Sequence, residues 1–146
     1  MNAYSEIRKV PLDYDGIKSS AYAVQMQSLE GWKEAGVVGS NYMLLSNQEV
    51  KDAADFVAQE CNINFKEDKT FFNGKVYIHS LVSEHVVGEI KAGDDIALGM
   101  QFWNSYDGSK AFGFSMMLYR LVCTNGMMSK QTFGTYRFKH EPGNEN

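Results

Sequence analysis

A long antiparallel hairpin is the strongest structural expectation for this chain. Residues 95–103 and 111–123 both alternate between apolar side chains and small or polar ones, which is the pattern of strands with one buried face. The loop between them reads Asn-Ser-Tyr-Asp-Gly-Ser and is rich in turn-forming residues. One face of the hairpin is strongly apolar, and the other has small positions that leave room for a helix, a ligand or another backbone. These positions are Gly99, Gly113 and Ser115.

A second hairpin is predicted around Asn73-Gly74. This dipeptide lies between two strand-like runs, residues 64–72 and 75–83. Asn-Gly is a strong hairpin signal because both residues tolerate the positive φ of a type I′ turn. The turn also predicts the faces of the second strand. Val76, Ile78, Ser80 and Val82 share one face, and Tyr77, His79 and Leu81 share the other.

The clearest helix begins after Ser46. Ser46 and Glu49 form a capping box, in which the serine hydroxyl accepts from the backbone amide three residues on. The following apolar residues fall on one stripe at helical spacing. They are Val50, Ala53, Ala54, Val57 and Cys61. We therefore predict a helix over residues 47–61 that packs on a sheet, with Cys61 as a small core residue and not a nucleophile.

Weaker patterns predict the other elements. Residues 1–20 are polar and turn-rich, with at most a short edge strand at residues 7–12. The predicted strands and loops that follow are a strand at 21–27, a glycine-containing loop over 31–39, and a short buried strand at 42–45. After the long hairpin, Thr124 or Asn125 can cap a short second helix through Ser129. Residues 133–139 are predicted as a final strand.

Together these elements predict an α+β fold. We expect a twisted antiparallel β-sheet of about five to six strands, packed by one main helix (residues 47–61) and a short second helix. The chain has 146 residues and 44% hydrophobic content, which suits one packed domain. We place this domain at residues 21–140, after a polar N-terminal segment (1–20) and before a flexible acidic tail (141–146).

The cysteines and the amino-terminal residues predict a compartment. Cys61 and Cys123 fall on different predicted elements, and two lone thiols suit a reducing environment. Residues 1–9 are polar and lack the apolar core of a signal peptide, and no apolar run approaches transmembrane length. We therefore expect a soluble, cytoplasmic protein without membrane contact.

The positive charges of the last third suggest a partner. Residues 108–140 contain five Lys or Arg and no Asp or Glu, whereas residues 1–107 contain nine Lys or Arg and sixteen Asp or Glu. A basic face could attract phosphates although the net charge of the chain is −4. The alternative is a solvated strand pair whose charges are neutralised by acidic residues elsewhere. The five cations are Lys110, Arg120, Lys130, Arg137 and Lys139.

Two six-residue stretches carry a resemblance. Asn-Ser-Tyr-Asp-Gly-Ser at 104–109 and Arg-Leu-Val-Cys-Thr-Asn at 120–125, followed by a basic strand ending at His140, resemble an uncharacterised phage- and plasmid-like family. That family is a domain of unknown function common in mobile elements. The resemblance covers residues 36–144 and implies a phage or plasmid context in a host bacterial cytoplasm, without supplying a reaction. The motif positions are Asn104, Asp107, Gly108, Ser109, Arg120, Cys123 and Asn125.

The order of strand, helix and antiparallel strands also looks like that of the annealing proteins of phage recombination. In those proteins oligomeric rings hold single-stranded DNA, although a likeness of fold does not establish function. This likeness implies a non-enzymatic homo-oligomer that binds single-stranded DNA in recombination or replication. Such a protein needs cations for phosphates and aromatic rings for bases. The candidate binding residues are Lys110, Tyr119, Arg120, Lys130, Phe133, Tyr136, Arg137 and Lys139.

Several of these residues also fit purely structural roles. Arg120 alternates with apolar residues and could pair with a buried carboxylate or with a loop carbonyl. Asp107 could be that carboxylate, or it could shape its own turn by accepting from a nearby amide. Phe133 and Tyr136 fit one side of the last strand as core residues.

We expect no enzymatic activity and no cofactor. The chain has no phosphate-binding loop, dinucleotide-binding turn or serine elbow. A metal-dependent hydrolase would require His79 to join Glu84-His85 and Asp94-Asp95, but acidic pairs beside turns are usually solvated. The alternative to nucleic-acid binding is a self-associating structural or interaction protein that acts on a host or phage partner through strand edges or exposed aromatics.

Overall fold

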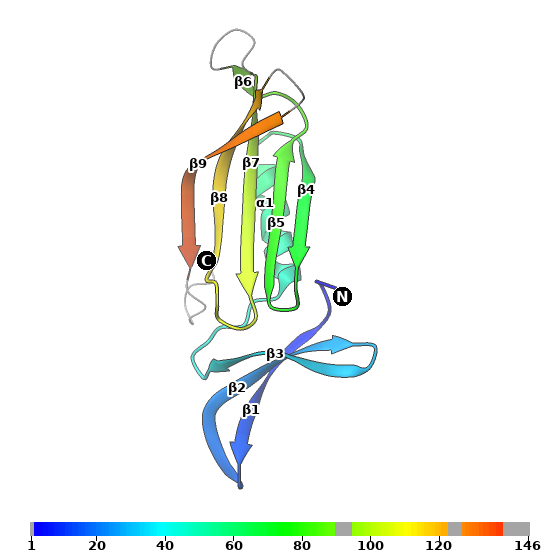
Figure 1. Cartoon of the computed structure of the whole chain (residues 1–146), viewed down its shortest axis with the longest axis vertical. Coiled ribbons are helices and arrows are strands. Elements are labelled where there is room, and N and C mark those ends of the chain that lie inside the picture. Colours follow the sequence, from blue (N-terminus) through cyan, green and yellow to red (C-terminus); the bar gives the residue numbers. More distant parts are fainter. Residues whose placement is uncertain (1, 90–94, 123–126, 139–146) are drawn as a thin grey trace.

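The computed structural model describes residues 2–89, 95–122 and 127–138, with side chains throughout these ranges except at 120–122, 127–133 and 138. Within this part the chain forms two antiparallel sheets and one helix (Figure 1). The first sheet, in the order β1-β2-β3, contains β1 (Ile7–Tyr14), β2 (Ile17–Ser28) and β3 (Gly31–Gly39). The helix α1 (Asn47–Glu60) follows.

The second sheet has six strands. Its main path is β4-β5-β7-β8-β9, and β6 pairs with β7. The strands are β4 (Phe65–Phe72), β5 (Val76–Ser83), β6 (Gly88–Glu89), β7 (Asp95–Ser105), β8 (Phe112–Val122) and β9 (Met127–Phe138). The described part is therefore largely β-sheet, and the prediction of a single sheet of five to six strands is corrected to two sheets.

The helix covers one face of the second sheet (Figure 1). Val50 and Ala54 are fully buried and pack with side chains from β5 and β7, namely Tyr77, Leu81, Met100 and Phe102. The predicted cap is confirmed, because the Ser46 hydroxyl accepts from the Glu49 backbone amide at 3.0 Å. Cys61 is half-buried at the carboxy-terminal cap, beyond the fully buried part of the stripe.

Both predicted hairpins are confirmed. β4 pairs with β5, and β7 pairs with β8, in antiparallel register. The turn at Asn73 differs from the prediction, because only Gly74 of the pair has a positive φ, at 94°. The Asn73 side chain instead accepts from the backbone amides of Lys75 and Val76, at 3.0 and 2.8 Å. The small positions of the long hairpin are occupied by the protein's own rings, since Tyr119 lies against Gly99 and Trp103 against Gly113.

The amino-terminal third is more ordered than predicted. Residues 7–14 and 17–28 form a hairpin, and the predicted loop over 31–39 is β3. The signal for the first turn is in the sequence, because Asp15-Gly16 is a two-residue hairpin turn in which both residues have positive φ, 49° and 76°. Glycines at both ends of β3 obscure its strand pattern, and pairing with β2 supplies the order that local sequence does not.

Two further predictions are wrong. Residues 42–45 are a connecting segment and not a strand, although Leu44 and Leu45 are half-buried against the two hydrophobic cores. The short second helix is replaced by strand from Met127 onward, because β9 pairs with β8 back to Val122. Its predicted caps, Thr124 and Asn125, and the predicted tail over 141–146 lie outside the described residues. Among the described helical residues, none forms a helix long and apolar enough to cross a membrane.

Candidate nucleic-acid interface

Three aromatic rings stand in a row across β7, β8 and β9, and we call Phe102, Phe114 and Tyr136 the ring row. Strand register places each ring beside the next. Ring centroids are 5.4 Å apart for Phe102 and Phe114 and 4.8 Å for Phe114 and Tyr136, with interplanar angles of 22° and 24°. Phe102 is 1% exposed and Tyr136 is 52% exposed. The row therefore runs from the core to a solvent-exposed ring that another ring supports.

Two of the predicted cations lie at the same end of the sheet as Tyr136. Arg137 is exposed and follows Tyr136 on β9, so the two side chains leave the strand on opposite faces. Lys110 is exposed just before β8, whose first residue, Phe112, pairs with Phe138. The Ser105 hydroxyl fixes the Lys110 backbone by accepting from its amide at 3.0 Å and donating to its carbonyl at 2.8 Å. Lys110, Tyr136 and Arg137 therefore lie at the same end of the second sheet, on its β8 and β9 side.

Tyr119 lies elsewhere. Its side chain is 1% exposed and belongs to a cluster with Val82 and Met117 on the sheet face opposite α1. Its hydroxyl lies 3.5 Å from an Asp68 carboxylate oxygen. Burial, together with the charge of Asp68, raises the pKa of Tyr119 to about 12. A ring enclosed in this way has no free face on which a base could stack.

The other predicted binding residues are placed by backbone alone or not at all. Register sets Arg120 beside Ser129 and Lys130 beside Tyr119, toward the end of the sheet away from Arg137. Phe133 on β9 has no opposite residue on β8, because the strand register shifts between Met116 and Met117. Lys139, Cys123 and Asn125 lie outside the described residues.

The motif residue Asn104 connects the sheet to the start of α1. Asn104 is fully buried, and its amide group donates to the Leu45 carbonyl at 2.8 Å and to the Asn47 side-chain oxygen at 3.1 Å. Asn47 in turn donates from its side chain to the Ala3 carbonyl and from its backbone to the Tyr106 hydroxyl. Burial raises the pKa of Tyr106 to about 12.

The remainder of the motif connects the two sheets. Tyr106 packs in the core of the first sheet with Val24 and Val38. Gly36 of β3 lies so close to Asp107 that an added Cβ would be 2.5 Å from the Asp107 Cα. Asp107 shapes its own turn, as one of the structural alternatives predicts, by accepting from the Ser109 amide at 2.9 Å, and Gly108 has a φ of 79°. Residues 104–107 therefore connect the two sheets and the start of α1, and we call this segment the joint.

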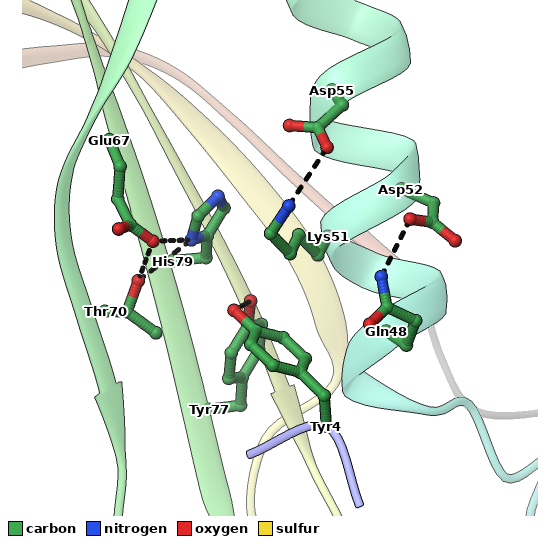
Figure 2. A network of polar contacts seen from close by, with 9 residues as sticks. All are labelled: Tyr4, Gln48, Lys51, Asp52, Asp55, Glu67, Thr70, Tyr77 and His79. Carbon is green, nitrogen blue, oxygen red and sulfur yellow. Dashed lines mark hydrogen bonds and ion pairs between the residues drawn. The ribbon is translucent and has the colours of Figure 1, made fainter. Parts of the chain in front are cut away.

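A polar cluster lies between α1 and the second sheet, and the sequence did not indicate it (Figure 2). His79 is 1% exposed, and its Nδ1 lies 3.1 Å from the Thr70 hydroxyl and 3.4 Å from a Glu67 carboxylate oxygen. Its Nε2 has no hydrogen-bond partner within the described part of the chain. The Tyr77 hydroxyl lies 2.9 Å from that of Tyr4.

Burial has the largest effect on the pKa of His79. Burial lowers the pKa of His79, Glu67 opposes that shift, and Lys51 on α1 adds to it. Lys51 is itself paired with Asp55 at 3.2 Å. Across residues 2–89, 95–122 and 127–138, no group of three or more His, Cys, Asp or Glu side chains is arranged to hold a metal ion.

Comparison with known protein families places the chain in a family. A family model described as "Domain of unknown function (DUF932)" matches residues 34–145. The chain belongs to this family. The DUF932 match includes α1, the second sheet and the joint, and it begins within β3. No curated protein and no solved structure matches the chain.

The resemblance drawn from residues 104–109 and 120–125 therefore identified a domain of unknown function with nearly the correct bounds. The ring row was not predicted as a unit. The sequence places Phe102 and Phe114 on apolar strand faces and predicts Tyr136 as a binding residue or a core residue of the last strand. Aligning the two strands of the long hairpin sets Phe102 beside Phe114.

Proposed function

We propose that this DUF932 protein binds single-stranded nucleic acid in a phage or plasmid setting, without enzymatic chemistry, during recombination or replication. The observation that carries the proposal is the ring row, which ends in the exposed Tyr136 at the same end of the sheet as the exposed cations Lys110 and Arg137. Single-strand binders combine aromatic side chains, on which the bases stack, with cations that follow the backbone, and they need no sequence-specific contacts.

The charge distribution supports the same proposal. Residues 108–140 carry no carboxylate side chain, so phosphates near Tyr136 meet no repulsion from that segment. Because Tyr136 and Arg137 leave β9 on opposite faces, a strand of nucleic acid would wrap the β9 edge, stacking a base on one side and placing a phosphate on the other.

The test is fluorescence anisotropy of a labelled single-stranded oligonucleotide, titrated with the protein and with a Tyr136→Ala variant. Loss of one stacked base weakens binding by about 1–3 kcal/mol, so we expect the dissociation constant to rise about tenfold. Phe71→Ala is the matched control, because Phe71 is similarly exposed (51%) on the opposite edge strand β4. Equal losses in both variants, or no binding by the wild-type protein at low salt, would contradict the proposal.

A second candidate function, a self-associating or partner-binding protein, is favoured by the β9 edge. β9 pairs with β8 on one side and with no other strand among the described residues, and a free edge is a template for pairing with another chain. Salt separates the two functions, because phosphate binding weakens steeply as salt rises, whereas apolar association persists or strengthens.

A further inference from the structure

The turn between β2 and β3 holds a leucine fully in solvent. The side chain of Leu29 is fully exposed. The turn around it is fixed by Ser28, whose hydroxyl donates to the Gly31 carbonyl at 2.6 Å and accepts from the Glu30 amide at 3.2 Å. Gly31 supplies the φ of 108° that the turn requires. These bonds fix the backbone without Leu29, so the folded chain gives no packing reason for a leucine here.

An open groove lies beside the same turn. Its volume is about 880 Å³, and its walls come from the β2-β3 hairpin, the residues before β1, and the turn between β4 and β5. The buried side chains of Met26 and Ala35 contribute apolar surface to it. Figure 1 shows the β2-β3 turn reaching outward below the β4-β5 turn. The groove is far larger than one side chain, so a hairpin tip is an occupant of suitable size.

We propose that this surface is a two-fold interface with a second copy of the chain, in which the Leu29 hairpin tip of each copy occupies the groove of the other. Leu29 and Glu30, at the tip of the hairpin, themselves line this groove. A second copy would remove Leu29 and the apolar surface of Met26 and Ala35 from water at once, because all three line the same groove. A patch that carries both halves of a contact is self-complementary under two-fold symmetry.

The charges of the patch fit the same occupant. Glu30 and Lys33 lie 3.6 Å apart, with 83% and 62% of their side chains exposed. The groove is lined by two acids, Glu30 and Glu34, and two bases, Lys33 and Lys75. When Leu29 of one copy enters the groove of the other, the adjacent Glu30 approaches Lys75 across the interface. Each copy offers both signs, so the two-fold contact pairs opposite charges twice.

The first test is analytical ultracentrifugation of the full chain from low to high micromolar concentration. We expect a monomer–dimer equilibrium that Leu29→Asp weakens at least tenfold. Ile17→Asp is the matched control, because Ile17 is 57% exposed beside the other hairpin turn of the first sheet, and it should leave the dimer intact. A wild-type chain that stays monomeric, or a dimer that withstands Leu29→Asp, would overturn the interface.

A charge exchange tests the two-fold arrangement. Lys75→Glu should weaken the dimer severalfold, and adding Glu30→Lys should restore it. Circular dichroism confirms that each variant is folded. Failure of the second change to restore the dimer would overturn the pairing of Glu30 with Lys75. The oligonucleotide titration reports separately on the proposed nucleic-acid function, because Leu29 lies outside both the β9 edge and the DUF932 match.

Discussion

At the scale of single residues, Asn104 makes a clear contribution to stability. Its amide satisfies two buried acceptors, the Leu45 carbonyl and the Asn47 side chain. Asn104→Ala leaves both without a donor, and we expect it to lower the free energy of unfolding by about 1–3 kcal/mol. Urea denaturation measures this loss. The control is Asn64→Ala, the same chemical change at an exposed position, and equal losses in the two variants would contradict the role of Asn104.

His79 gives a pH-dependent prediction. Burial lowers the pKa of His79 in the folded protein, so the unfolded chain takes up a proton first as the pH falls. The stability associated with neutral His79 is therefore fully present above the unfolded pKa of about 6.5 and decreases as the pH falls below it.

Urea denaturation between pH 7.5 and pH 5 tests this sign. The wild-type protein should lose stability on acidification more steeply than His79→Gln. His85→Gln changes an exposed histidine and should follow the wild-type curve. Parallel curves for the wild type and His79→Gln would show that the pKa of His79 is the same in the folded and unfolded states.

At the scale of elements, β3 and the motif loop meet at Gly36. A Cβ at this position would lie 2.5 Å from the Asp107 Cα and 2.7 Å from the Tyr106 carbonyl oxygen, which are backbone atoms that cannot rotate away. We expect Gly36→Ala to force the two sheets apart and to cost about 1–3 kcal/mol in thermal or urea unfolding. Gly39→Ala, on the same strand with nothing within 4 Å, should be nearly neutral.

The elements predicted from sequence are those with local signals. The helix has a cap and an apolar stripe, and the two hairpins have a turn between strands of alternating apolar and polar residues. The sequence therefore predicts all three. β3 and the first part of β9 have no such signal. Glycines interrupt the pattern of β3, and the Thr-Asn before β9 resembles a helix cap. Both segments become strands because they pair with a neighbouring strand. The polar cluster around His79 could not be predicted, since it joins Tyr4, α1, β4 and β5 through tertiary contacts.

At the scale of the whole molecule, an acidic chain is proposed to bind a polyanion. This is physically consistent only when the favourable charges are local and the acidic remainder is screened. At about 0.1 M salt the screening length is about 10 Å, so phosphates at the β9 edge interact mainly with the nearest cations. The net charge of −4 then affects the rate at which the nucleic acid approaches the protein more than the strength of the bound contacts.

The salt dependence of oligonucleotide affinity tests this local effect. Each neutralised phosphate of a single strand contributes about −0.7 to the slope of log affinity against log salt. Arg137→Gln should therefore make the slope shallower by about 0.7. Lys18→Gln is the matched control, because it removes the same charge from an exposed position on β2 and changes the net charge equally. Equal slopes in the two variants would mean that total charge, and not the β9 edge, governs binding.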